Sequence, residues 1–182
     1  MSTFKDSGII LKIKKIWEKD FIYTIFSLKF WKITAQKKIS NKEKTIDLWF
    51  HINYEIKTWD NINKISNIKI INEFNPLNKN FEEINSYLFL LKITLDNSPI
   101  WVENTEIFEI INSINKYKKK DFLEKNILAS IKILNIFWIL DLNHKNPTIS
   151  KILNFIHKNN FSKIIKLTWI NEETKKELQK IL

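Results

Sequence analysis

Apolar and polar residues alternate along residues 7 to about 74. The alternation is clear at Ile52, Tyr54 and Ile56, which are separated by polar residues. An apolar and polar pattern of period two predicts β-strands with one buried face. The expected strands are SGIILKIKKI, DFIYTIFSL, WKITAQK, TIDLWFHINYEI and NKISNIKIINEF. Five strands in about 70 residues suit a small closed β-barrel.

The hydrophobic period changes to that of helices after the polar stretch Asn75 to Asn80. The expected helical segments are FEEINSYLFLLKITL, TEIFEIINSINKY, DFLEKNILASIKILNIFWIL, PTISKILNFIHK, FSKIIKL and NEETKKELQKIL. Pro147 and Asn171 are ordinary helix-start signals. The pattern therefore predicts an α+β chain with two domains, a five-stranded β-barrel in residues 1–75 followed by an all-helical domain in residues 76–182.

Positive charge is the first compositional feature that changes this picture. The chain has 182 residues, 30 lysines, no arginine and 20 acidic residues, which gives a net charge of +10. Residues 1–75 hold 14 Lys and eight acidic residues, whereas residues 76–182 hold 16 Lys and 12 acidic residues, so the strand-rich half is denser in positive charge. Such a surface indicates a polyanion partner, although a merely solvated surface would carry the same charge. Without Arg, bidentate recognition of bases or phosphates is excluded.

Lysines concentrate around the end of the third predicted strand and the loop that follows it, and lysines of the first strand could extend the series. Lysines arranged in this way could follow the phosphates of a nucleic acid, and a solvated charge run is the alternative interpretation. A second basic run, residues 116–120, could add an auxiliary contact or be a solvated loop. The lysines that we predict to bind nucleic acid are Lys12, Lys14, Lys29, Lys32, Lys37, Lys38, Lys42 and Lys44.

Five aromatic residues of the strand-rich half have two interpretations. Alternating aromatic side chains on a barrel face could stack on bases. They more commonly fill the barrel core, which is the interpretation that we favour. The residues are Tyr23, Phe26, Phe30, Phe50 and Tyr54.

The chain lacks the residues that several kinds of active site need. It has no Cys, which excludes disulfides, thiolate zinc sites and cysteine nucleophiles. His51, His144 and His157 have no metal-ligand spacing, and Glu18 and Asp20 fit a turn better than a catalytic pair. We therefore expect a protein that is not an enzyme, with no catalytic residue, metal, cofactor or small-molecule substrate. No apolar run suits a signal peptide or a membrane span, so we expect a cytoplasmic protein with no membrane partner.

Glycine is nearly absent and tryptophan is frequent. The chain has one Gly, Gly8, and seven Trp, whereas average usage gives roughly a dozen Gly. Trp17, Trp31, Trp59 and Trp169 lie at predicted turns or connections, which favour Gly. We therefore hypothesise that the Trp codons are UGA, which the source organism reads as Gly, a reassignment known in some bacterial lineages. The alternative is seven true Trp in the core or in stacking positions, and we count no Trp as a functional aromatic.

Short motifs along most of the chain match one known pattern. They are Gly8-Ile9-Ile10-Leu11-Lys12, Trp17-Glu18-Lys19-Asp20, Ile25-Phe26-Ser27 and Trp31-Lys32-Ile33-Thr34-Ala35 followed by Lys37 and Lys38, with further matches at residues 86–88, 107–111, 131–140 and 146–168. Together they resemble the RecO family of bacterial DNA repair and recombination mediators, whose pattern runs G-I-V-L, a G-E-x-D turn, L-F-T and G-K-I-S-A before a basic segment. Trp17, Trp31 and Trp138 stand where that family has Gly. The chain is shorter than typical members and lacks the four-Cys zinc element of some of them.

The resemblance implies an N-terminal OB-fold, a helical C-terminal domain and a nucleoid-associated protein that binds single- and double-stranded DNA. It also implies strand annealing, recombinase loading, and partnership with RecR and the single-strand DNA-binding protein. Two alternatives remain open. One is an OB-fold protein that binds RNA in translation or tRNA biology, and the other is a scaffold whose helical half binds another protein.

Overall fold

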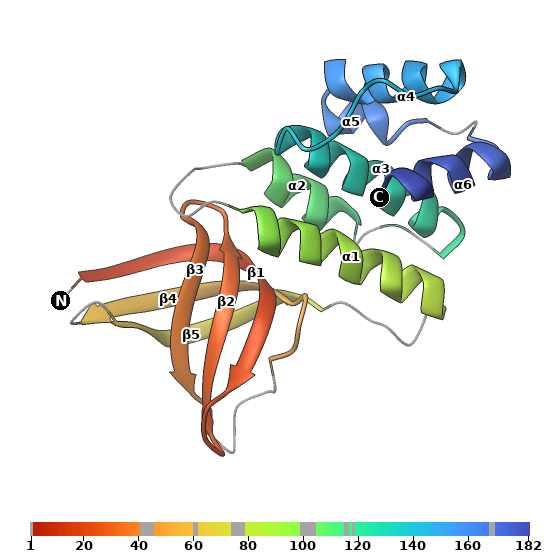
Figure 1. The fold of residues 1–182 in the computed structure, drawn as a ribbon. Coiled ribbons are helices and arrows are strands. Elements are labelled where there is room, and N and C mark those ends of the chain that lie inside the picture. Colours follow the sequence, from red (N-terminus) through yellow and green to blue (C-terminus); the bar gives the residue numbers. More distant parts are fainter. Residues whose placement is uncertain are drawn as a thin grey trace. The chain divides into compact units, whose positions relative to one another are not determined.

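The computed structural model describes the chain except for residues 1, 41–45, 60–61, 74–78, 99–104, 115–116, 118 and 168–169. The described residues form strands followed by helices, which confirms the predicted α+β class (Figure 1). The strands are β1 (Ser2–Lys15), β2 (Asp20–Ser27), β3 (Trp31–Lys38), β4 (His51–Trp59) and β5 (Ile62–Asn72). The helices are α1 (Phe81–Asn97), α2 (Thr105–Ile114), α3 (Lys119–Ile136), α4 (Pro147–Lys158), α5 (Phe161–Ile164) and α6 (Glu172–Ile181).

The chain divides into two compact units. Residues 1–75 and 98–108 form the first, here called the sheet unit, and residues 76–97 and 109–182 form the second, here called the helical unit. One division falls beside residue 75, where the polar stretch of the sequence begins. The other arises because residues 98–108, within the predicted helical domain, belong with the strands.

The strands of the sheet unit form a sheet that closes on itself into a ring, in the order β1-β2-β3-β5-β4 and back to β1. Neighbouring strands are antiparallel except β3 and β5, which run parallel and pair at Gln36 and Lys64. The long strand β1 closes the ring, because its first half pairs with β4 and its second half with β2. A register shift between Ile10 and Lys12 marks a β-bulge, and a bulge bends a strand toward two different neighbours.

Gly8 lies where β1 is paired on both sides. A Cβ atom at this position would stand 2.4 Å from Cγ2 of Ile25 and 2.9 Å from the carbonyl oxygen of Phe26. The φ angle of Gly8 is not positive. This position therefore requires the absence of a side chain, and not the backbone freedom of Gly.

Inward-facing side chains of every strand fill the closed sheet. Burial of each large apolar side chain contributes about 1.5–3 kcal/mol. The fully enclosed group is Ile10, Tyr23, Ile25, Ile33, Ala35, Ile46, Ile52, Tyr54, Ile56 and Ile65. Phe30 and Phe50 pack against this group, and Phe26 is buried with its ring stacked on Phe108 at a centroid distance of 6.5 Å. The interpretation as barrel core is confirmed for Tyr23 and Tyr54. Phe26 is buried outside this group, and Phe30 and Phe50 are half-buried against it.

Two strands differ from the predicted segments. The alternation predicted a strand from residue 45 to residue 56, but β4 begins at His51 because Leu48 and Trp49 form a turn. The φ angle of Trp49 is 71°, which no strand accommodates. β1 begins at Ser2, earlier than the predicted residue 7, because residues 2–7 pair with β4. Local alternation does not reveal this pairing, since the partner strand lies far along the chain.

The four Trp residues predicted at turns have different places. Trp31 follows the β2–β3 turn with a φ angle of 59°. Trp17 lies in the β1–β2 turn and is 73% exposed, but its φ angle is not positive. Trp59 is the last residue of β4 and pairs with Ile62, so its prediction as a connection residue is wrong. Trp169 lies outside the described residues.

The helical unit uses the polar helix starts that the sequence predicted. The side chain of Asn146 caps α4 and that of Asn171 caps α6, by accepting backbone N–H hydrogen bonds of 2.9 and 2.8 Å. At the start of α1, Asn80 Oδ1 accepts from the backbone of Glu83, and Glu83 Oε2 accepts from the backbone of Asn80. Each cap stabilises its helix by about 1 kcal/mol.

Helix α3 is central to the helical unit, because all of residues 125–134 are buried. Its Phe122 ring packs against Tyr87 of α1 at a centroid distance of 6.1 Å. The sequence predicted a single helical run over residues 121–140. The helix ends earlier, at Ile136, because Trp138 turns the backbone into the left-handed region with a φ angle of 59°.

Candidate nucleic-acid interface

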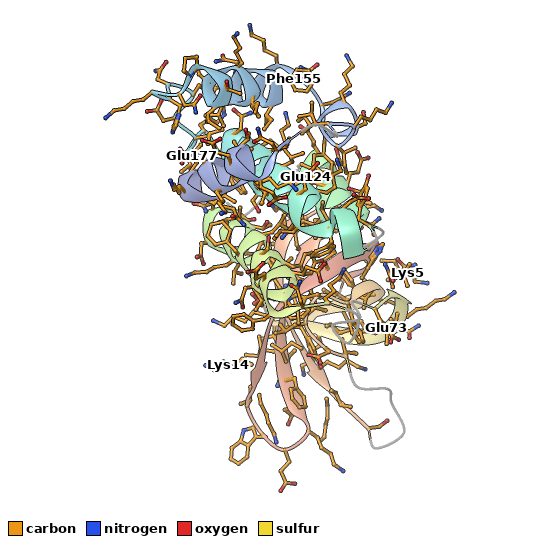
Figure 2. The ribbon with its side chains drawn as sticks, turned by 90° about the vertical axis from the view of Figure 1, so that its right-hand side faces the viewer. Lys5, Lys14, Glu73, Glu124, Phe155 and Glu177 are labelled. Atoms are coloured by element: carbon orange, nitrogen blue, oxygen red, sulfur yellow. The ribbon has the colours of Figure 1, made fainter. Side chains whose placement is uncertain are left out.

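The strand register shows which lysines of the sheet unit share a face. Lys14 of β1 pairs with Ile22 of β2, which pairs with Gln36 of β3. Gln36 pairs with Lys64 of β5, which pairs with Lys57 of β4. Directly paired residues point to the same face of a sheet, so these residues form one row around the outside of the closed sheet. All three lysines of this row are exposed, and Figure 2 shows Lys14 projecting outward.

Two more exposed lysines flank this row. Lys12 lies two residues before Lys14 on β1 and pairs with Thr24, and Lys38 lies two residues after Gln36 on β3. Two residues along a strand span about 7 Å, and neighbouring strands lie about 4.8 Å apart. Lys12 and Lys38 therefore each lie about 7 Å along their own strand from the row. We call Lys12, Lys14, Lys38, Lys57 and Lys64 the outer lysine face.

Lys57 and Lys64 are paired directly across β4 and β5. Like charges in this arrangement destabilise a sheet. The ion pairs of the described residues include Lys5 with Glu55 at 3.5 Å, but they do not include Lys57 or Lys64. An anion between the two ammonium groups would relieve this repulsion.

Sequence reasoning missed Lys57 and Lys64. The predicted strands ended at Ile56 and began at Asn63, so Lys57 lay in the predicted connection and no register was available for it. In the structure β4 extends to Trp59 and β5 begins at Ile62, and their register sets Lys57 opposite Lys64. Their position in the same row as Lys14 had no local signal, because it depends on the pairing of β3 with β5.

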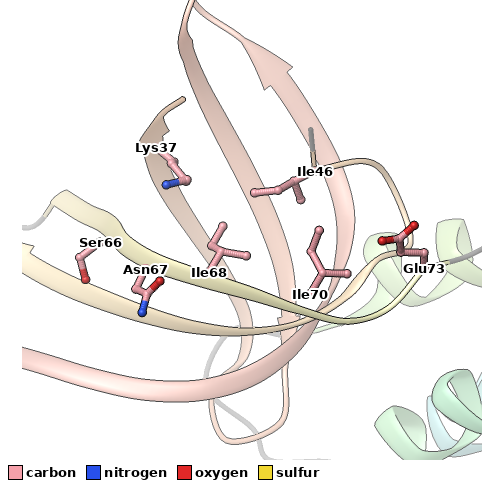
Figure 3. Close-up of a pocket in the computed structure, with 7 residues that line it drawn as sticks. All are labelled: Lys37, Ile46, Ser66, Asn67, Ile68, Ile70 and Glu73. Atoms are coloured by element: carbon pink, nitrogen blue, oxygen red, sulfur yellow. The ribbon is translucent and has the colours of Figure 1, made fainter. Parts of the chain in front are cut away.

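Lys37 lies on the opposite face of β3 from Lys38. Side chains alternate along a strand, and Lys37 shares the inward side with Ile33 and Ala35 and is only 7% exposed. It lines a pocket of about 490 Å³ together with apolar side chains of β5 and with Ile46 (Figure 3). The predicted series of lysines is therefore not one surface.

Lys29 and Lys32 lie at the far end of β2 and β3 from Lys38. Strand β2 runs from the partner of Lys38 to Ser27, which is about 23 Å at 3.3 Å per residue. Asp6 fixes the turn that carries Lys29. Its Oδ2 accepts a hydrogen bond of 3.0 Å from the backbone N–H of Lys29 and a second hydrogen bond from the hydroxyl of Ser27. Lys29 and Lys32 are therefore not part of the same row as Lys38. Lys42 and Lys44 lie outside the described residues.

Several lysines of the helical unit have structural partners. The ammonium of buried Lys132 donates to the carbonyl oxygen of Asn159 at 2.9 Å, just beyond the end of α4. Buried Lys125 donates to the carbonyl oxygen of Leu167. Lys175 forms an ion pair of 2.7 Å with Glu172, whose pKa is lowered by this hydrogen bond. In the second basic run, residues 116 and 118 lie outside the described residues, as do the side chains of residues 119 and 120.

Several titratable side chains have local structural partners. His51 lies at the start of β4 with its Nε2 2.7 Å from Ser7 Oγ, and His157 Nδ1 lies 2.9 Å from Asn135 Oδ1. Burial raises the pKa of the Tyr54 hydroxyl, which stays a donor. Within the described part of the chain, no group of three or more His, Cys, Asp or Glu side chains could hold a metal ion. In that same part, no helix has the length and apolar character needed to cross a membrane.

The turn predicted for Glu18 and Asp20 is present. The backbone N–H of Asp20 donates to the carbonyl oxygen of Trp17 at 3.3 Å, and the backbone N–H of Ile16 donates to that of Asp20 at 2.9 Å. Both acidic residues thus belong to the hairpin that joins β1 and β2, as the sequence indicated.

Comparison with protein-family models and with curated proteins gave no match to this chain. The resemblance to the RecO family therefore rests on the short motifs of the sequence.

Proposed function

We propose that this chain is a nucleic-acid-binding protein whose closed sheet is an OB-fold barrel, and that it acts as a DNA-binding mediator of recombination in DNA repair. The observation that carries the proposal is the outer lysine face, with its like-charge pair of Lys57 and Lys64. The ring order and the five strands support the OB-fold, a five-stranded Greek-key barrel that commonly binds oligonucleotides. In that fold, ligands bind across the second and third strands and the loops joining β1 to β2 and β4 to β5. The outer lysine face spans this same region.

The chemistry of this face supports recognition of phosphates and not of bases. Its charged groups are all Lys, which interacts with phosphate as a point charge. Of the five aromatic candidates for base stacking, three are buried and two, Phe30 and Phe50, are half-buried against the core. Binding of this kind depends steeply on salt and weakly on sequence.

Agreement between the family motifs and the structure supports the finer part of the proposal. The family's first Gly corresponds to Gly8, where a Cβ atom does not fit. Two other family glycines correspond to Trp31 and Trp138, whose positive φ angles are the conformation that favours Gly. On this basis we expect a protein of the cytoplasm and nucleoid that binds single- and double-stranded DNA, anneals strands and assists recombinase loading. RecR and the single-strand DNA-binding protein are the partners that the resemblance implies.

Binding to a labelled single-stranded oligonucleotide, measured by fluorescence anisotropy at several salt concentrations, tests the proposal. The double variant Lys57→Gln and Lys64→Gln should bind more weakly. Its log-log salt slope should be shallower by about 1.4, since each phosphate contact to a single strand contributes about 0.7. A matched control is Lys151→Gln with Lys158→Gln, which removes the same charge from exposed positions of α4. If both double variants lower the slope equally, the outer lysine face is not the binding surface.

The choice between DNA and RNA is tested with oligonucleotides of matched sequence. Tighter binding of single-stranded RNA would favour the translation or tRNA alternative, and no salt-dependent binding to either would favour the protein scaffold. Annealing of complementary DNA strands, monitored by fluorescence, tests the mediator activity. We expect the full chain to anneal strands without added nucleotide. Tight DNA binding without any annealing would contradict the mediator proposal.

A further inference from the structure

Three residues of the described chain have a positive φ angle, and all three are Trp. The angles are 59° at Trp31, 71° at Trp49 and 59° at Trp138. In this left-handed region the Cβ atom of an L-residue meets the neighbouring backbone, so Gly is the usual occupant and bulky residues are rare. Asn tolerates the conformation best among other residues. The chain is rich in Asn, yet Asn occupies none of the three positions.

Trp138 occupies the glycine position of a complete helix C-terminal motif. Helix α3 ends at Ile136, so Trp138 is the second residue after the helix. Its backbone N–H donates to the carbonyl oxygen of Asn135 at 3.0 Å, and the N–H of Ile139 donates to that of Leu134 at 3.0 Å. These two bonds define the Schellman motif, whose left-handed residue is usually Gly. The Trp138 side chain is 86% exposed, so burial does not account for its presence.

Trp49 and the residue after it are held by hydrogen bonds with Ile10 of β1. The backbone N–H of Trp49 donates to the carbonyl oxygen of Ile10 at 2.8 Å, and the N–H of Ile10 donates to the carbonyl oxygen of Phe50 at 3.1 Å. This pair of bonds continues the ladder between β1 and the residues just before β4. The backbone of residue 49 therefore has little freedom to relax out of the strained region.

Gly8 and Trp31 each differ from Trp49 and Trp138. The single Gly of the chain does not have a positive φ angle and serves close packing instead. Trp31 pairs with Ser27 directly after the β2–β3 turn, which is another place where a left-handed residue commonly closes a turn. Trp31 differs from the other two because it is buried and its ring meets Phe26 edge to face at 6.3 Å. Backbone geometry therefore indicates Gly most clearly at residues 49 and 138.

From these conformations we infer that the natural protein carries Gly at positions 31, 49 and 138, and that the gene encodes them with UGA codons read as Gly. The inference extends the hypothesis drawn from composition, because it identifies Trp49 and Trp138 as glycine positions on backbone geometry. It does not rest on the proposed function. It also means that the ring of Trp31 is absent from the core of the natural protein.

The gene and the native protein decide the inference directly. UGA codons at positions 31, 49 and 138, together with peptides of the native protein whose masses fit Gly at these positions, would support it. UGG codons, or native peptides whose masses fit Trp, would overturn it.

Thermal unfolding of recombinant protein with the printed sequence gives a second readout. Trp49→Gly and Trp138→Gly should each raise Tm by about 2–6 °C, because each relieves the strain of a bulky residue at positive φ. Trp17→Gly is the matched control, since Trp17 is exposed in a turn without a positive φ angle. It should leave Tm unchanged or lower it slightly. A fall in Tm at both residues 49 and 138 would count against glycine positions there.

Discussion

Some lysines of the sheet unit and some lysines of the helical unit have opposite environments. In the sheet unit, register places five exposed lysines on one outer face, two of them directly opposite each other. In the helical unit, Lys125 and Lys132 are buried and donate to carbonyl oxygens near helix ends, and Lys175 and Lys180 form ion pairs with glutamates. Formal charge alone suggests two similar basic halves. The structure shows that only part of this charge is available to a ligand.

The difference has a simple physical origin. A buried ammonium is stable only where hydrogen-bond acceptors replace its lost water, and the exposed carbonyls at helix ends supply such acceptors. In a sheet, most strand carbonyls accept hydrogen bonds from the neighbouring strand, so fewer are left to accept from an ammonium. The lysines of the outer lysine face are exposed and remain solvated. Three predictions test this contrast, from the largest expected effect to the smallest.

The largest effect is expected from Lys132→Met, which keeps the length of the side chain and removes its ammonium. The carbonyl oxygens of Ile156 and Asn159 lose their donor, so the free energy of unfolding should fall by about 1–3 kcal/mol. Chemical denaturation measures this change. Lys57→Met is the control from the sheet unit, and it should leave stability unchanged or raise it by about 0.2–1 kcal/mol through relief of the like-charge pair. Greater destabilisation by Lys57→Met than by Lys132→Met would reverse the contrast.

A smaller effect is expected when lysines on the two faces of β3 are compared. Lys38→Gln should make the log-log salt slope of single-strand binding shallower by about 0.7, because Lys38 lies on the outer lysine face. Lys37→Met should leave the slope unchanged, because its side chain faces inward. Anisotropy titrations at several salt concentrations compare these neighbouring residues. Equal slopes for the two variants would show that strand alternation does not decide which lysine meets the ligand.

The smallest effect is expected at the exposed pair of Glu172 and Lys175. The hydrogen bond from Lys175 lowers the pKa of Glu172, so the pair stabilises the fold above the ordinary pKa of Glu and loses this contribution as the pH falls through the lowered value. Because the pair is exposed, its effect on stability should be hardly measurable. An NMR titration of the Glu172 carboxyl group should show its pKa rising toward the ordinary value of 4.5 in Lys175→Met. An unchanged pKa would mean that the pair does not form in solution.

Several features of the protein follow from the sequence alone, because their causes are local. Period-two alternation located the five strands, and the change to a helical period located the helices. Pro147 and Asn171 marked helix starts, because both signals act within the first turn of a helix. The core role of Tyr23 and Tyr54 followed from their place in the alternation. The scarcity of Gly indicated that some Trp stand at glycine positions.

The tertiary structure decided what depends on residues far apart in the chain. The pairing of β3 with β5 set Lys64 and Lys57 in the row of Lys14, and no local pattern encodes that contact. Hydrogen bonds with Ile10 of β1 fixed the turn at Trp49, which the alternation alone had predicted as strand. Which lysines point outward also depended on register, since a shift of one residue exchanges the two faces of a strand. Composition therefore indicated a basic protein, whereas closure of the sheet selected the lysines that can act together.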